Sequence, residues 1–318
     1  MFSLLLCAVA IAGETTHGQH SMAPAKKHYL DKEIESYLDH CANLPVSYSK
    51  NICLGRYFRA MTQQYSAKRA IASAQELVKE GVIEDCHVAA HMIGAANIVK
   101  HDFDLETALS SCSMACDEGC VHGVMRTYIP HEIQPSHLAG TIKHICDTTR
   151  ADAWLHRQCI HGIGHGIMNN GFLPVREAIK LCNLFEGEDV DSCLGGLFME
   201  NMHPALVWPE DRLRKQLFSV CADIVAMRND TYTQYCIESI GEGLMFYTGH
   251  DLGKSLGYCE LLPGEHWTVC KQAAIDEAGN ALSRFDVKTC DLAPDDRKDF
   301  CRSLAPIQQT ENPDQPPD

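Results

Sequence analysis

Residues 178–201, AIKLCNLFEGEDVDSCLGGLFMEN, contain the pattern that decides the fold of this chain. A segment with helical apolar spacing ends at Cys182, a short polar loop follows, and a second such segment begins at Cys193. In this second segment Leu194 and Leu197 share one helical face. The stretch therefore predicts a helix, a cysteine, a loop, a second cysteine and a second helix, with the two cysteines placed to form a crosslink.

The same arrangement recurs along the chain. The later cysteine of each unit stands 31 to 43 residues after the preceding one, at Cys53, Cys86, Cys120, Cys159, Cys193, Cys236, Cys270 and Cys301. A period of this size indicates stacked two-helix units, each too small to bury a hydrophobic face alone. We therefore predict an all-α fold, an α-solenoid of about eight disulfide-stapled helical hairpins over residues 28–305.

Six of the later cysteines have an earlier partner 11 to 15 residues before them. The predicted pairs are Cys41 with Cys53, Cys146 with Cys159, Cys182 with Cys193, Cys221 with Cys236, Cys259 with Cys270, and Cys290 with Cys301. Each crosslink of this loop length stabilises a fold by about 3 kcal/mol. Four cysteines are left without a short-range partner, namely Cys86, Cys112, Cys116 and Cys120. We predict that Cys86 pairs with either Cys112 or Cys116, and that whichever of these two remains pairs with Cys120. The alternative is that a CxxxC…C group of these cysteines holds a metal.

Small side chains recur three residues after the later cysteine. They are Ala89, Gly123, Gly162, Gly196, Ser239 and Ala273. Glycine costs about 1 kcal/mol relative to alanine inside a helix. Its recurrence at one helical position therefore predicts that neighbouring helices approach closely there.

The composition indicates the compartment and excludes some partners. Seventeen cysteines are too many for an ordinary cytosolic enzyme. We interpret residues 1–13 as a signal peptide whose removal takes Cys7 with it, residues 14–27 as a flexible leader and residues 306–318 as a disordered tail. The predicted location is secreted or periplasmic. A net charge of −15 argues against nucleic acid and anionic membranes as partners, and no segment of the mature chain is apolar enough to span a membrane.

The join at residues 178–201 resembles the join between two Sel1-like repeats, which belong to the TPR type of helical repeat. In that family one helix ends in Lys-Ala-Cys and the next opens with Gly-Cys followed by Leu-Gly-x-Leu-Tyr. The segments around Cys53, Cys120 and Cys159 are similar to a lesser degree. The resemblance implies a right-handed superhelix with one disulfide per join and a concave face that binds other proteins. This chain differs in its longer cysteine spacing, its irregular unit length and its many histidines.

Histidines are concentrated in the helices after the later cysteines. In CIHGIGHG, His161 and His165 are four residues apart on one helical face, two and six residues after Cys159. A second such pair, His87 and His91, follows Cys86 at one and five residues. Either that helix is rotated by about 100°, or its histidines point inward toward the unit that contains His122. The predicted metal ligands are His87, His91, His122, His161 and His165.

The positions two and six residues after the later cysteines form a polar column along the stacked helices. With Glu200 one position further on, the predicted groove residues are Arg126, Glu200, Glu238, Glu242, Gln272 and Asp276. His101 and His250 are each followed by an aspartate, and we predict that Asp102 and Asp251 cap the next helices and that the histidines are loop residues. His203, next to Pro204, is predicted to be a turn residue.

Two functions fit these patterns. The leading interpretation is an exported binding protein whose concave groove takes a protein or peptide partner. The alternative is a histidine-rich metal-binding protein or metalloenzyme with zinc, copper or iron, which requires nitrogens of at least three of the five histidines within about 4–5 Å of one point. The sequence has no His-Glu-x-x-His, no phosphate-binding glycine loop, no GxSxG elbow and no CxxCH. It leaves open whether the protein is an enzyme, what it acts on, and its oligomeric state.

Overall fold

The computed structural model describes residues 36–41, 43–44, 48–83, 85–113, 115–116, 118–280 and 285–305. Throughout these residues the regular secondary structure is helical and contains no strand, which confirms the predicted all-α class. The expected signal peptide, leader and tail, and with them Cys7, lie outside the described residues. No helix within the described part of the chain is long and apolar enough to cross a membrane.

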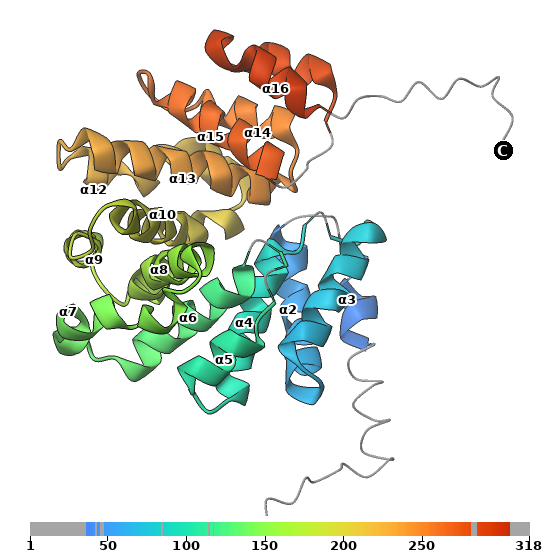
Figure 1. Cartoon of the computed structure of the whole chain (residues 1–318). Coiled ribbons are helices and arrows are strands. Elements are labelled where there is room, and N and C mark those ends of the chain that lie inside the picture. The colour runs from blue at the N-terminus through green and yellow to red at the C-terminus, as the bar shows by residue number, and fades with distance from the viewer. Residues whose placement is uncertain are drawn as a thin grey trace, which may run out of the picture.

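Seven helices that contain a later cysteine or begin directly after one form one continuous row, in which each helix packs against the next (Figure 1). They are α2 (Tyr48–Gln64), α4 (His87–Lys100), α6 (Gly119–Glu132), α8 (Ala153–Met168), α10 (Glu188–Met202), α13 (Asp230–Thr248) and α15 (His266–Asn280). Their apolar stripes build the main core, which runs from Ile98 to Cys270. Smaller clusters lie at α2–α4 and around α14 to α16.

Shorter elements connect and flank this row, and they are much less regular. They are α3 (Ala67–Lys79), α5 (Leu105–Ser111), η1 (Pro135–His137), α7 (Leu138–Thr141), η2 (Ile142–His144), η3 (Asp147–Thr149), η4 (Asn169–Gly171), α9 (Val175–Cys182), η5 (His203–Val207), α11 (Glu210–Gln216), η6 (Leu217–Val220), α12 (Ala222–Val225), α14 (Leu252–Cys259), η7 (Val287–Leu292), η8 (Asp295–Arg297) and α16 (Lys298–Leu304). Several units replace the expected first helix by short 3₁₀ segments. A regular series of eight hairpins is therefore still a prediction.

Polar side chains mark several helix starts. Asp251 caps α14 by accepting a hydrogen bond from the backbone NH of Lys254, as predicted. The cap of α5 is Asp104 and not Asp102, which instead has a positive φ in the turn after α4. The prediction for Asp102 was wrong because Asp102 and Phe103, both with positive φ, form the turn and the helix begins two residues later.

Eight disulfides connect the described cysteines. All six predicted short-range pairs are present. The four remaining cysteines pair as Cys86 with Cys116 and Cys112 with Cys120. This pairing selects one of the two predicted arrangements and excludes a metal site built from these thiols.

Neighbouring helices of the row meet at glycine, as the spacing predicts. An added Cβ at Gly123 would overlap the carbonyl oxygen of His91 on α4. At Gly196 it would overlap the carbonyl oxygen of His161 on α8. The two positions bring α6 against α4 and α10 against α8 without an intervening side chain, and each contact is made at the backbone of a histidine.

The row of helices curves until distant parts of the chain touch. Helix α13 contacts α2, and η5 contacts α2 as well. Asp85, which precedes α4, accepts a hydrogen bond from His250, which follows α13, across 165 residues of sequence. Both side chains are largely buried. In the interior of this curve, Arg126 and His165 of the polar column line a cavity together with residues of α2, η5 and α13.

Candidate functional site

Five imidazoles from three consecutive helices meet in this interior. His87 and His91 come from α4, His122 from α6, and His161 and His165 from α8. The Nε2 atoms of His87 and His91 are 3.0 Å apart, and the Nδ1 of His122 is 3.3 Å from the Nε2 of His91. The ring centroid of His165 is 5.1 Å from that of His91, so His91 on α4 also reaches a histidine of α8, two helices further along the row.

Two overlapping groups of these histidines have the geometry of a metal site. One contains His87, His91 and His122, and the other contains His122, His161 and His165. In each group one ring nitrogen per residue lies within 4.8 Å of the others. His122 belongs to both groups. The five side chains can therefore hold one ion in either group.

Hydrogen bonds from outside the cluster fix which ring nitrogens are available. The Nδ1 of His87 is 3.1 Å from the carbonyl oxygen of Cys116, and the Nε2 of His122 is 2.8 Å from the Oε1 of Gln158. Both oxygens can only accept, so each of these nitrogens carries the proton. The other nitrogen of each ring is then an unprotonated base that faces His91.

His165 is held in the same way by a buried carboxylate. Its Nδ1 donates to the Oε2 of Glu200 at 3.1 Å, and its Nε2 is buried without a partner among the described residues. Arg126 binds the same carboxylate with two hydrogen bonds, at 2.8 and 2.9 Å. A carboxylate that orients a histidine and leaves its second nitrogen free is a recurrent support for metal ligands.

Burial favours the neutral form of four of the five rings, those of His91, His122, His161 and His165. Desolvation, followed by the neighbouring imidazoles, lowers the pKa of His91, His122 and His161 well below the ordinary value. Desolvation also lowers the pKa of His165, although Glu200 opposes the shift. The pKa of Glu200 itself falls to about 2, because the hydrogen bond from His165 and the charge of Arg126 outweigh the effect of burial. At neutral pH the site therefore holds four neutral imidazoles, those of His91, His122, His161 and His165, beside one ionised carboxylate, which suits a cation.

A cavity of about 440 Å³ opens beside the cluster. His87, His91 and His165 line it together with Arg126 and Glu200. An ion bound by the first group of histidines would therefore have a side that faces open space. Structural metal sites are closed by protein ligands, whereas catalytic sites keep such a position open.

The remaining residues of the predicted groove lie away from the cluster. Glu238 accepts a hydrogen bond from Gln234, Gln272 bonds Asp296 and Asp276 pairs with Arg297. These contacts are local and mostly exposed. Their predicted role in binding a protein partner remains a prediction.

Glu242 differs from the rest of the groove residues because it is half-buried beside other carboxylates. Desolvation, with Glu238 and Asp276 nearby, raises its pKa to about 8. Of the predicted groove residues, only Arg126 and Glu200 lie at the site itself.

Sequence reasoning missed four residues of the site. Gln158 orients His122, and Arg56, Arg59 and His203 line the cavity. Burial lowers the pKa of His203 to about 4. This residue, which was predicted to lie in a turn, is therefore a neutral side chain that lines the cavity. Gln158 directly precedes Cys159, a position that no repeat pattern singled out. The other three reach the cavity only through the curvature of the row.

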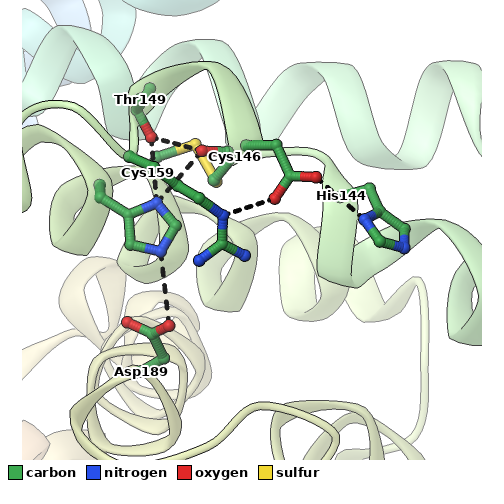
Figure 2. Close-up of polar contacts among 8 residues, drawn as sticks. His144, Cys146, Thr149, Cys159 and Asp189 are labelled. Atoms are coloured by element: carbon green, nitrogen blue, oxygen red, sulfur yellow. Dashed lines mark hydrogen bonds and ion pairs between the residues drawn. A yellow bond between two sulfur atoms is a disulfide. The ribbon is translucent and has the colours of Figure 1, made fainter.

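A second polar group superficially resembles a hydrolase triad. Figure 2 shows Thr149 beside the Cys146–Cys159 disulfide, with Asp189 on the neighbouring helix. His156 lies 3.2 Å from the Oγ1 of Thr149 and 3.4 Å from the Oδ2 of Asp189. The hydroxyl of Thr149 is buried and donates to the carbonyl oxygen of Cys146 at 2.7 Å. It therefore supports the disulfide loop and is not presented to a substrate.

Comparisons with protein-family models, with curated proteins and with solved structures found no match to this chain. The resemblance to Sel1-like repeats thus stays a prediction, and the class of the site rests on its own geometry.

Proposed function

We propose that this protein is a metalloprotein that binds a transition-metal ion through His87, His91 and His122, with His161 and His165 as the alternative or second set of ligands. The observation that carries the proposal is that unprotonated ring nitrogens of two histidines face the ring of a third. Two rings of the first group donate outward to fixed oxygen acceptors, and their free nitrogens face a third ring within 3.0 and 3.3 Å.

These separations match the size of a metal ion. With Zn–N bonds of about 2.0–2.1 Å, two ligands of a tetrahedral ion are about 3.3 Å apart. Without a cation, one of the facing ring nitrogens lacks a hydrogen-bond donor, because a proton on the Nε2 of His91 can be donated to His87 or to His122 but not to both. When His91 instead carries its proton on Nδ1, an ion can bind the lone pairs of all three facing nitrogens together.

The donor set narrows the choice of ion. Neutral imidazole suits zinc, copper, iron and nickel, whereas calcium and magnesium prefer oxygen ligands. The thiols of the neighbouring cysteines are all oxidised, so the soft sulfur atoms that line the cavity are the thioethers of Met92 and Met199. We therefore favour zinc, copper or iron, with one coordination position open to the cavity.

The compartment proposed for this metalloprotein is an oxidising one outside the cytosol. Eight disulfides are typical of secreted and periplasmic proteins. The proposed architecture is a curved array of disulfide-stapled helical repeats of the Sel1-like kind. In this proposal the array acts as a closed frame that brings ligands from three units to one point.

Elemental analysis of the oxidised, undenatured protein tests the proposal. About one equivalent of metal is expected, or an uptake of that size when Zn²⁺ is titrated into stripped protein. His122→Gln removes the residue common to both groups and should abolish uptake, because neither group then has three imidazoles. The matched control is His144→Gln, which changes an exposed histidine that bonds only Asp147.

Two results would contradict the proposal. One is less than about 0.1 equivalents of metal after reconstitution with zinc, copper and iron in turn. The other is uptake that His122→Gln and His144→Gln leave equally unchanged, because the metal would then lie elsewhere.

A further inference from the structure

The charge of the cavity is opposite to that of the protein. The chain carries 42 acidic and 27 basic residues. Among the residues that line the cavity, however, the formally charged ones are Arg56, Arg59, Arg126 and Glu200. The excess of positive charge is therefore local, and it faces an enclosed space where counter-ions are concentrated.

The guanidinium groups of the cavity differ in whether they form an ion pair with a carboxylate. Arg126 forms a bidentate ion pair with Glu200, so these two charges cancel. Arg56 and Arg59 are three residues apart on one face of α2, and their side chains are exposed at the cavity. Neither forms an ion pair with any carboxylate of the described residues. Within the part of the chain that the structure describes, the two arginines therefore supply charge that no carboxylate pairs with.

The walls between these arginines and the imidazoles are apolar. They include Val88 and Met92 from α4, Met199 from α10, Leu206 from η5 and Phe246 from α13. Phe246 lies stacked on His87, with 6.1 Å between ring centroids. A volume of about 440 Å³ falls in the range of sites for small organic molecules. An inorganic anion would fill only a small part of it.

We propose that the cavity binds an organic anion, with its carboxylate or phosphoryl group held by Arg56 and Arg59 and its apolar body lying along Met92 and Phe246 toward the histidine cluster. The planar fork of arginine matches both headgroups by paired hydrogen bonds. The inference goes beyond metal binding and stands independently of it, because none of the residues that hold this ligand is a proposed metal ligand.

Calorimetric titration of metal-stripped and of metal-loaded protein tests the proposal with three probes. Phenylacetate has the headgroup and the body, phenylacetamide is its neutral isostere, and inorganic phosphate is a headgroup without a body. Phenylacetate is expected to bind at least about tenfold more tightly than either of the others. Arg56→Gln combined with Arg59→Gln should remove the preference for phenylacetate over phenylacetamide.

The matched control is Lys68→Gln combined with Arg176→Gln, which removes the same charge from exposed positions outside the cavity. This variant should keep the preference, and all variants should keep their metal uptake. Phenylacetate that binds no more tightly than phenylacetamide, shows no saturable binding, or keeps its preference in the Arg56→Gln, Arg59→Gln protein would overturn the proposal. Phosphate that binds as tightly as phenylacetate would also overturn it. Since metal uptake is measured separately, failure of the metal site and failure of the anion site give different results.

Discussion

Replacing Gly123 with alanine is expected to push α6 away from α4 and to separate the imidazoles of His122 and His91. The new Cβ would overlap the carbonyl oxygen of His91. Because that oxygen belongs to backbone, no side-chain rotation relieves the overlap, and the two helices must part until the contact reaches about 3.4 Å or more.

The magnitude follows from two opposing effects. Overpacking of this kind costs about 1–3 kcal/mol, and alanine returns about 1 kcal/mol of helix propensity. The expected net loss in the free energy of unfolding is about 1–2 kcal/mol, which lowers the Tm by about 2–4 °C for each kcal/mol in a chain of this size class. Displacement of His91 relative to its neighbour should also weaken zinc binding by about 10–100-fold.

Urea unfolding followed by far-UV circular dichroism measures the stability of the oxidised protein, and competition with a chelator measures its zinc affinity. Gly257→Ala is the matched control, because a Cβ at that position of α14 meets no atom within 4 Å. This variant should be stabilised by about 0.5–1 kcal/mol with unchanged zinc affinity. If Gly123→Ala proved as stable as the wild type and bound zinc equally well, the close approach of α4 and α6 would not be what places the ligands.

Two further perturbations address the carboxylates and the disulfides. The folded-state pKa of Glu242 is about 8 against an ordinary value of 4.5, so the folded protein binds the extra proton and its stability falls as the pH rises through this window. The free energy of unfolding of Glu242→Gln should therefore match that of the wild type at about pH 5 and exceed it at about pH 9. The largest difference is about 5 kcal/mol at 1.36 kcal/mol per pKa unit, and screening at this half-buried site reduces it. If the difference measured by urea unfolding does not grow with pH, the environment assigned to Glu242 is contradicted. Changing Cys182 and Cys193 together to serine opens a disulfide with a sequence separation of 11 and should cost about 3 kcal/mol; an unchanged urea midpoint would show that packing alone holds α9 against α10.

The features that recur from unit to unit, namely the crosslinks and the close helix contacts, could be predicted from the sequence. The spacing of Cys182 and Cys193 predicted a crosslink between two helices, and the small residues at Gly123 and Gly196 predicted close helix contacts. Both features are local to one join, so a single chain displays them several times. The inward direction of His87 and His91 was one of two predicted alternatives, and the contact with His122 selects it.

The contacts that depend on the curvature of the whole row of helices could not be predicted from the sequence. The contact between Asp85 and His250 spans 165 residues, and it depends on small rotations added over several units. The same curvature turns Arg56 and Arg59 toward His203 and gives the cavity its second wall. Because no pattern within one unit encodes the angle to the next, sequence reasoning placed these residues on a helix or in a turn and not in a common site.

The disulfides beside the histidines imply an order of events in the biosynthesis of this protein. Cys86–Cys116 joins the start of α4 to the segment before α6, Cys112–Cys120 joins the end of α5 to the start of α6, and Cys146–Cys159 joins the segment before α8 to that helix. Helices α4, α6 and α8 carry all five imidazoles. A reduced chain would present the same histidines on helices free to slide past one another. In the proposed metalloprotein, oxidation is therefore expected to come before metal loading, so the ion would be acquired in the oxidising compartment in which the disulfides form.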